Sequence, residues 1–264
     1  MPKPAYIELG FGKHREQIPV LYEDRSVMAV DKPRGWMLVP FSWQKTDRNL
    51  QAAISSSIAA GDFWARSRNL KFLRYIHRLD ADTTGILLFA KSQGALETFS
   101  EMFEQRQMEK IYFAVVEGIP KETDWNCSLK IAPEPDRYGK MKVDAQAGRE
   151  AETYFHLLQT RSNWSLVEAR PITGRTHQIR IHLAATGLPV VGDPIYGKIK
   201  AYKAGQKPPS LALRAIRLAF KNPFTRRPVE INAPTKAFLR EYAFNLPKPE
   251  TSKPDAPGAD QTAK

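Results

Sequence analysis

Residues 75–90 read Tyr-Ile-His-Arg-Leu-Asp-Ala-Asp-Thr-Thr-Gly-Ile-Leu-Leu-Phe-Ala, a polar loop that runs directly into a short apolar strand. Asp80 precedes the apolar run, among threonines and ahead of Gly85, whose missing side chain permits a tight backbone. A carboxylate on a loop at the start of a strand is typical of a catalytic loop. The alternative is a polar turn in which Asp80 and Asp82 cap neighbouring backbone N–H groups. The residues alone leave both interpretations open.

Short strands and a few helices are predicted on both sides of this loop. Runs rich in β-branched and aromatic residues predict strands at 27–31, 85–90, 111–117, 153–159, 165–169, 215–220 and 229–232. Apolar residues at helical spacing predict helices at 49–60, 92–106, 176–186 and 235–244, the last with Thr235 as its N-cap. Because strands and helices do not alternate regularly, we expect an α+β fold with a mixed, mainly antiparallel sheet and peripheral helices rather than a doubly wound sheet.

Composition narrows the classes of protein that the chain can represent. Of the 264 residues, 40 are Lys or Arg and 28 are Asp or Glu, which leaves a net charge of +12. Such a surplus predicts a polyanionic partner, although a basic surface can also serve solubility alone. The single cysteine, Cys127, excludes an internal disulfide framework. With neither a bilayer-length apolar stretch nor a secretory signal, we expect a cytoplasmic protein without a membrane partner.

A second polar cluster lies in residues 169–183, Ala-Arg-Pro-Ile-Thr-Gly-Arg-Thr-His-Gln-Ile-Arg-Ile-His-Leu. Thr176 is placed to cap the predicted helix, and His177 and Arg180, three residues apart, can point into one cleft. His177 and His182 are separated by about 140° around a helix, so they are poor joint ligands and no metal site is expected. The alternative is an amphipathic helix whose basic face is only solvated.

The third cluster is the strand around Tyr112. By alternation Tyr112, Ala114 and Val116 share one face. From the residues alone, a tyrosine of the hydrophobic core is the commoner role for such a position.

Taken together, these clusters resemble the motifs of the RluA family of RNA pseudouridine synthases. The stretch 77–85, His-Arg-Leu-Asp-Ala-Asp-Thr-Thr-Gly, is similar to the family's His-Arg-Leu-Asp loop, which continues after two residues with Thr-Ser-Gly; here Thr84 replaces the serine. Three further stretches resemble the family's N-terminal motif, tyrosine strand and C-terminal motif, in the family's order: 21–35, 110–114 and 169–197.

The resemblance implies an isomerase that converts uridine in RNA, either ribosomal or transfer RNA, to pseudouridine without a cofactor. It implies a sheet split by a central catalytic cleft. Asp80 would be the essential carboxylate, Tyr112 the aromatic partner of the base and Arg180 the cation beside Asp80. Arg78 would enter the stack in place of the extruded uridine.

Further residues are expected to bind the RNA. They are His77, Thr84, Arg175, His177, Lys198, Arg226 and Arg227. We expect an N-terminal extension over residues 1–20, a catalytic domain over 21–245 and, because it is polar and proline-rich, a disordered tail over 246–264. A monomer is the default expectation.

The proposed chemistry suits a carboxylate. Breaking the glycosidic bond builds positive character at C1′, which Asp80 can meet as a nucleophile, a base or an electrostatic partner. Arg180 would keep that carboxylate ionised and oriented. Whether Asp80 attacks C1′ or C6, or removes a ribose proton, stays open.

Two alternatives come from other classes of protein. Residues 80–84, Asp-Ala-Asp-Thr-Thr, match the Asp-x-Asp-x-Thr loop of Mg²⁺-dependent haloacid-dehalogenase-like phosphatases, but the stretch before them is not an apolar strand. The other alternative is an RNA-binding module without catalysis. Analysis of the products formed from labelled RNA in the presence of EDTA distinguishes the isomerase, the phosphatase and the RNA-binding module.

Overall fold

The structure, a computed structural model, describes residues 3–11, 14–38, 48–137, 139–197 and 208–245. The strands are β1 (Tyr6–Phe11), β2 (His14–Glu23), β3 (Val27–Lys32), β4 (Arg74–Tyr75), β5 (Thr84–Ala90), β6 (Glu109–Glu117), β7 (Asp124–Cys127), β8 (Ile131–Pro133), β9 (Met141–Val143), β10 (Thr153–Arg161), β11 (Trp164–Pro171), β12 (Leu213–Lys221) and β13 (Pro228–Asn232). The helices are α1 (Leu50–Ala59), α2 (Phe63–Arg66), α3 (Gln93–Glu104), α4 (Gln178–Ala185) and α5 (Lys236–Glu241).

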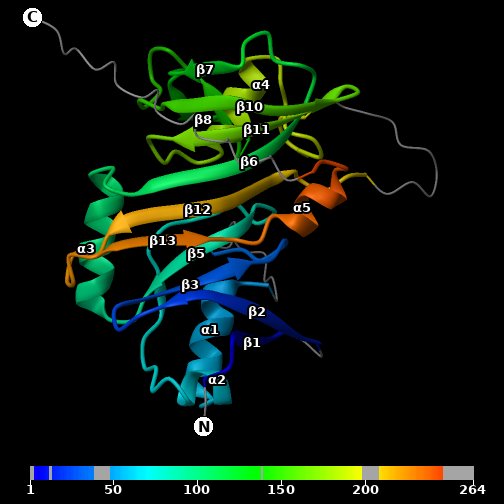
Figure 1. The fold of residues 1–264 in the computed structure, drawn as a ribbon. Helices are drawn as coiled ribbons and strands as arrows, with labels where there is room; N and C mark the ends of the chain where they lie inside the picture. The colour runs from blue at the N-terminus through cyan, green and yellow to red at the C-terminus, as the bar shows by residue number, and fades with distance from the viewer. Residues whose placement is uncertain (1–2, 12–13, 39–47, 138, 198–207, 246–264) are drawn as a thin grey trace, which may run out of the picture.

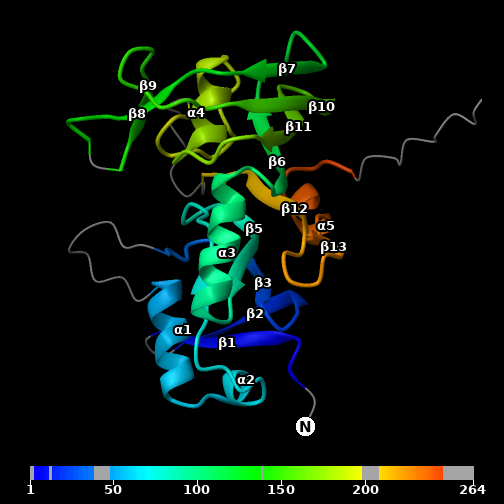
Figure 2. The ribbon, with the colours of Figure 1, turned by 90° about the vertical axis from the view of Figure 1, so that its left-hand side faces the viewer.

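Within the described ranges, eleven strands form one long, twisted sheet, which runs from bottom to top of Figure 1. Its main path is β1-β2-β3-β5-β12-β6-β11-β10-β7, with β13 on β12 and β4 on β5. The contact between β5 and β12 is parallel, whereas the other paired strands are antiparallel. Helices lie around the sheet, with α3 against β5 (Figure 2). The expected mixed, mainly antiparallel α+β fold is confirmed.

The structure contains several elements that the patterns did not predict. They are β1, β2, β4, β7, β8, β9 and α2, which are short or predominantly polar. Residues 6–11 and 14–20, expected as part of an extension, form β1 and most of β2 and pair at the edge of the main sheet. The division of the chain into domains stays a prediction, and residues 246–264 lie outside the described ranges. No helix in those ranges is long and apolar enough to cross a membrane.

The ends of α1 and α3 follow from local side chains. Asn49 accepts a hydrogen bond from the backbone N–H of Ala52, and Ser92 accepts one from that of Ala95. Each side chain satisfies one of the N–H groups that the first helical turn leaves without a partner. Both helices begin within one residue of the predicted positions.

The start of α4 differs from the prediction. Thr176 is not its N-cap; that position is held by His177, whose backbone is left-handed with a φ of 57°. The polar segment before α4 therefore continues for one residue more than the capping pattern indicated. Thr235 does stand at the N-cap of α5, but its side chain makes no capping hydrogen bond there.

The parallel contact divides the sheet into two halves with separate cores. Only two residue pairs join the strands there, Thr84 with Arg214 and Gly85 with Ala215. A Cβ atom on Gly85 would lie 2.0 Å from the carbonyl oxygen of Ala215, so only glycine, here with a φ of +105°, permits this approach. Tyr112 packs against both hydrophobic cores. The loop before β5 is thus placed at the junction of the two halves.

Candidate active site

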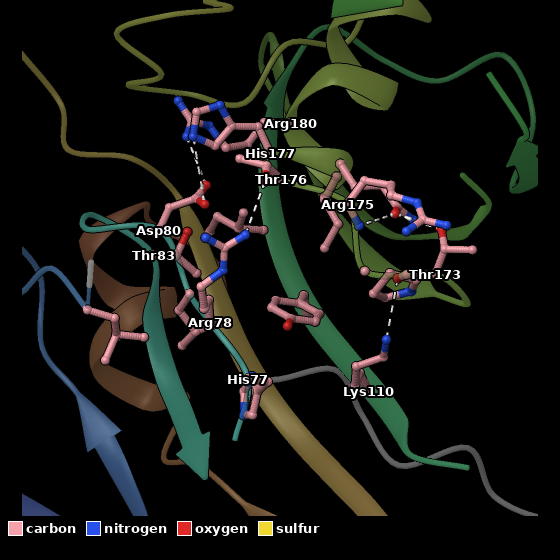
Figure 3. A pocket seen from close by; sticks show the side chains of 18 of the residues that line it. His77, Arg78, Asp80, Thr83, Lys110, Thr173, Arg175, Thr176, His177 and Arg180 are labelled. Atoms are coloured by element: carbon pink, nitrogen blue, oxygen red, sulfur yellow. Dashed lines mark hydrogen bonds and ion pairs between the residues drawn. The ribbon is translucent and has the colours of Figure 1, made fainter. Parts of the chain in front are cut away.

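A pocket of about 840 Å³ lies at this junction. One wall is the loop 76–83, which precedes β5, and the opposite wall is residues 171–180, which lead from β11 into α4 (Figure 3). Tyr112 of β6 and Leu213 of β12 line the pocket between these walls. The sheet therefore brings together segments that are about a hundred residues apart in sequence.

Asp80 faces two basic side chains across the pocket. Nη1 of Arg180 donates a hydrogen bond to Oδ2 of Asp80 at 2.8 Å, and Nε2 of His177 lies 3.8 Å from Oδ1 (Figure 3). The side chain of Asp80 is 24% exposed, whereas that of Arg180 is 4% exposed. The carboxylate of Asp80 is therefore oriented by its partners and still open to a molecule in the pocket, rather than used to cap a turn.

Arg180 is itself held by a buried acid. Its Nε and Nη2 donate to the two carboxylate oxygens of Asp193 at 2.7 and 2.8 Å. The backbone N–H groups of Ile195 and Tyr196 also donate to Asp193. Burial disfavours charge on Arg180, but the hydrogen bonds with Asp193 and the charges of Asp80 and Asp193 outweigh it and raise its pKa. The guanidinium group is therefore a fixed cation, and its Nη1 donates to Asp80.

The protonation of His177 follows from its neighbours. The hydroxyl of Tyr196 accepts a hydrogen bond from the backbone N–H of Met141 and lies 2.9 Å from Nδ1 of His177. Burial lowers the pKa of His177, which favours the neutral ring at pH 7. The hydroxyl of Tyr196 then donates to Nδ1, and the proton of the ring sits on Nε2, toward Asp80.

Tyr112 lines the same pocket. Burial, and secondarily the charge of Asp80, raise the pKa of Tyr112 above its ordinary value of 10.0. Its hydroxyl is therefore protonated at neutral pH, and its ring offers an apolar face on which a base can stack.

Lys32 holds the loop that carries Asp80 in place by hydrogen bonds to its backbone. The buried ammonium group donates to the carbonyl oxygens of Ala81, Thr83 and Pro33 at 2.6, 2.9 and 3.1 Å. Burial lowers the pKa of Lys32 to about 7. Lys32 was not among the predicted site residues, although it ends a strand whose first four residues are apolar.

Several RNA-binding candidates do reach the pocket. Arg78 is exposed, and its Nη2 lies 3.4 Å from Oγ1 of Thr176. Arg175 lines the opposite wall and donates from Nε to the carbonyl oxygen of Glu150 at 2.9 Å. His177 completes this group beside Asp80.

The side chain of His77 also makes contacts within the fold. Its Nε2 accepts the backbone N–H of Leu88 at 3.1 Å, and its ring stacks on Phe103 with centroids 4.6 Å apart. Burial, reinforced by the charge of Lys110, lowers the pKa of His77 to about 3. The side chain of His77 therefore holds the loop onto β5 and also lines the pocket, and its contact with RNA stays a prediction.

Other candidates are not brought to the site. Thr84 begins β5 and does not line the pocket, whereas its neighbour Thr83 does. Arg226 and Arg227 lie in the turn between β12 and β13, outside the pocket. Lys198 falls outside the described residues.

Asp193 is the functional residue that the sequence reasoning missed most clearly. It stands within the stretch 169–197 that carries the resemblance, yet nothing local to it indicates that its partner is Arg180. A lone acid between Gly192 and Pro194 is the signal that could have singled it out.

Comparisons with known proteins identify the family. The family model described as RNA pseudouridylate synthase matches residues 26–185. A protein of Vibrio vulnificus named ribosomal large subunit pseudouridine synthase C is 34% identical over 232 residues, which is 86% of this chain and 69% of the relative. A Vibrio cholerae protein named dual-specificity RNA pseudouridine synthase RluA is 31% identical over 78% of both chains.

Solved structures lead to the same family. Human RNA pseudouridylate synthase domain containing 1 superposes with a TM-score of 0.64 at 26% identity and covers 82% of this chain and 83% of its own. Human RNA pseudouridylate synthase domain containing 4, at 21% identity and a TM-score of 0.67, covers 87% of this chain and 94% of its own and shares the fold. With the family model matching more than half of the chain, this protein belongs to the RNA pseudouridine synthases of the RluA type, isomerases that convert uridine in RNA to pseudouridine.

Proposed function

We propose that this enzyme isomerises uridine in ribosomal RNA of the large subunit and that Asp80 is its essential catalytic residue. The observation that carries the assignment of Asp80 is its partly open carboxylate, held by Arg180 at 2.8 Å in a pocket of about 840 Å³. The choice of RNA rests on the name of the Vibrio vulnificus relative. Such a substrate would place the enzyme in the cytoplasm.

Asp80 has the placement that glycosidic bond cleavage requires. As the bond between N1 and C1′ breaks, positive character grows at C1′, and a fixed carboxylate stabilises it by charge or by covalent attack. Arg180 keeps Asp80 ionised and oriented without filling the pocket, because two of its donors are committed to Asp193. The base can then turn and rejoin the ribose through C5.

Tyr112 would stack on the uracil during this rearrangement. Its raised pKa keeps the hydroxyl protonated at neutral pH. The phenol is then a hydrogen-bond donor beside Asp80 rather than a strong base.

The uridine must leave its stack to reach Asp80, at a cost of a few kcal/mol for unstacking. Arg78 is suited to take its place, because it is exposed at the rim and only a 3.4 Å contact with Thr176 restrains it. A planar guanidinium stacks on bases and also donates to phosphates. The Arg78→Ala variant should therefore bind or turn over structured RNA more weakly while its fold is retained, and near-wild-type kinetics would count against this role.

The test uses unmodified RNA made by transcription in vitro. The purified protein is incubated in EDTA with large-subunit ribosomal RNA, small-subunit ribosomal RNA and transfer RNA in parallel, and the nucleosides are analysed by mass spectrometry. We expect pseudouridine in the large-subunit RNA, and none when Asp80→Asn replaces the wild type. RNA binding by Asp80→Asn should persist.

Each other outcome rejects a defined part of the proposal. Product in transfer RNA alone rejects the substrate. Product from a clean preparation of Asp80→Asn removes Asp80 from its role. Binding without product by the wild type supports the non-catalytic module.

A further inference from the structure

Three cations, Arg106, Lys110 and Arg175, line the pocket, and a fourth, Arg149, adjoins Glu150, whose carbonyl oxygen accepts a hydrogen bond from Arg175. Arg106 follows α3, Lys110 lies on β6, Arg149 precedes β10 and Arg175 precedes α4. Figure 3 shows Lys110 and Arg175 together on that side. The fold therefore brings like charges from four separate segments into one region, which is unfavourable unless a negative charge joins them.

The pKa values of Lys110 and Arg175 are lowered in this region. Burial, and then the charge of Arg106, lower the pKa of Lys110 to about 8. Burial, and then the charges of Arg149 and Arg106, lower the pKa of Arg175.

No described carboxylate forms an ion pair with any of the four. Lys110 reaches only the carbonyl oxygen of Thr173 at 3.4 Å, and Arg175 only that of Glu150. These carbonyl contacts position the side chains without neutralising them.

Nearby arginines are different, because acids already occupy them. Nε of Arg170 lies 2.7 Å from Glu168, and Arg217 bridges Glu109 and Glu230 at 2.8 and 2.9 Å. Both line a second groove, which shares Arg106 and Lys110 with the pocket. Unlike these two arginines, Arg106 and Lys110, which both grooves share, have no acidic partner among the described residues.

The backbone of Arg106 carries a second, independent signal. Its φ of 59° is left-handed, at a position after a helix where glycine is strongly favoured. A long charged residue at such a position is disfavoured by conformation and gains no described side-chain partner. Its side chain is exposed at the junction of the grooves.

We propose that Arg106, Lys110, Arg149 and Arg175 form a binding site for a backbone phosphate of the RNA strand, at a nucleotide next to the flipped uridine. This inference rests on the proposed function, because it takes RNA as the substrate. A strand whose target base enters the pocket leaves through the junction of the grooves and passes its phosphodiester between the four cations. Lys110, half-buried, interacts with a phosphate more strongly than a fully solvated lysine does.

The test compares two variants with a matched control. In Arg106→Gln/Arg149→Gln, two exposed cations without described partners become neutral. Arg66→Gln removes an exposed arginine on α2, which neither lines the pocket nor contacts its walls. Binding to transcribed large-subunit ribosomal RNA is measured by filter retention at about 50 to 300 mM KCl, because the affinity of a protein that contacts phosphates falls with salt over this range.

The double variant should bind RNA at least about tenfold more weakly near 150 mM salt, and its log–log salt slope should fall by up to about one, for the single phosphate contact that is weakened. Arg66→Gln should match the wild type. A third variant, Arg106→Gly, should bind RNA more weakly although its melting temperature rises, since glycine relieves the left-handed backbone.

Two results overturn the phosphate site. One is a double variant with the salt slope of the wild type, and the other is a loss of affinity in Arg66→Gln, in logarithmic units, at least half that of the double variant, which would mean that only overall charge matters. The proposed function is judged separately by the pseudouridine that the wild type forms. A wild type that makes product while the double variant binds like the control rejects the phosphate site alone.

Discussion

Asp80 and Arg180 are 100 residues apart in the sequence, yet their side chains meet at 2.8 Å across the pocket. The loop before β5 carries the acid and α4 carries the cation, so the contact joins the two halves of the sheet. Arg180 is fixed in turn by Asp193, whose side chain is 0% exposed. The orientation of the Asp80 carboxylate therefore depends on a residue that does not touch it.

This dependence predicts the effect of Asp193→Asn. Removing one charge of a buried pair leaves Arg180 partly uncompensated, which should cost about 3 kcal/mol of stability. Arg180 then loses its anchor, and kcat should fall by at least about tenfold while the dissociation constant for RNA changes by less than about threefold. Turnover assays with RNA in excess, below the melting temperature, give kcat. Filter retention gives the dissociation constant.

Glu23→Gln is the control for that variant. Glu23 also sits in a buried ionic cluster, with Lys91 at 2.6 Å and Arg68 at 2.9 Å, but away from the pocket. We expect comparable destabilisation with kcat per folded molecule unchanged. If both variants lose kcat equally, Asp193 has only a structural role.

Thr83 offers a prediction in which stability and activity separate. Its hydroxyl oxygen is buried without a hydrogen-bond partner and its side chain lines the pocket. Thr83→Val keeps the shape and removes that unsatisfied group, so stability should stay equal or rise by up to about 1 kcal/mol. If the hydroxyl binds the substrate, kcat/KM should fall by about three- to tenfold.

Thr153→Val provides the contrast. Thr153 is equally buried, but its hydroxyl bonds to Nδ1 of His182 at 3.0 Å and to Gln178 at 2.9 Å. This variant should lose stability, by about 1–3 kcal/mol. An unchanged kcat/KM in Thr83→Val would show that the hydroxyl of Thr83 has no substrate contact.

The buried ring of His77 makes stability depend on acid pH. Its pKa is lowered to about 3 in the folded protein from 6.5, so the unfolded chain binds more protons between these values. Stability therefore falls as pH drops below 6.5, by at most about 1.4 kcal/mol per pH unit for this group. In urea unfolding at pH 7, 6 and 5, His77→Gln should lack this part of the loss, and a constant difference from the wild type would contradict the assignment.

The buried amine of Lys32 makes stability depend on alkaline pH. Burial lowers its pKa to about 7 from 10.5, so the unfolded chain holds the extra proton between pH 7 and 10.5 and this residue's contribution to stability rises with pH there. The stability of the wild type relative to Lys32→Met should increase from pH 7 to pH 10. Lys32→Met should also lower turnover, because the carbonyl groups of the catalytic loop lose their donor. A pH-independent difference between the two proteins would argue against a buried, titrating amine.

Local sequence patterns predicted much of the secondary structure. Every predicted strand and helix corresponds to an element of the structure, because alternation, helical spacing and caps such as Asn49 and Ser92 act over a few residues. Strands such as β2 and β7 escaped prediction because their stability comes from pairing with distant neighbours rather than from their own apolar residues.

The linear sequence by itself determined many of the strands and helices, the surplus of positive charge and the family resemblance, and that resemblance led to the prediction of Asp80 as the essential carboxylate. The tertiary structure alone decided that Asp193 anchors Arg180, that Lys32 is buried beneath the loop, and that Thr83 rather than Thr84 faces the pocket. The physical reason is range. Propensity and periodicity act between neighbours, whereas these contacts depend on how strands far apart in the chain pair and on the close approach of β5 and β12 at Gly85.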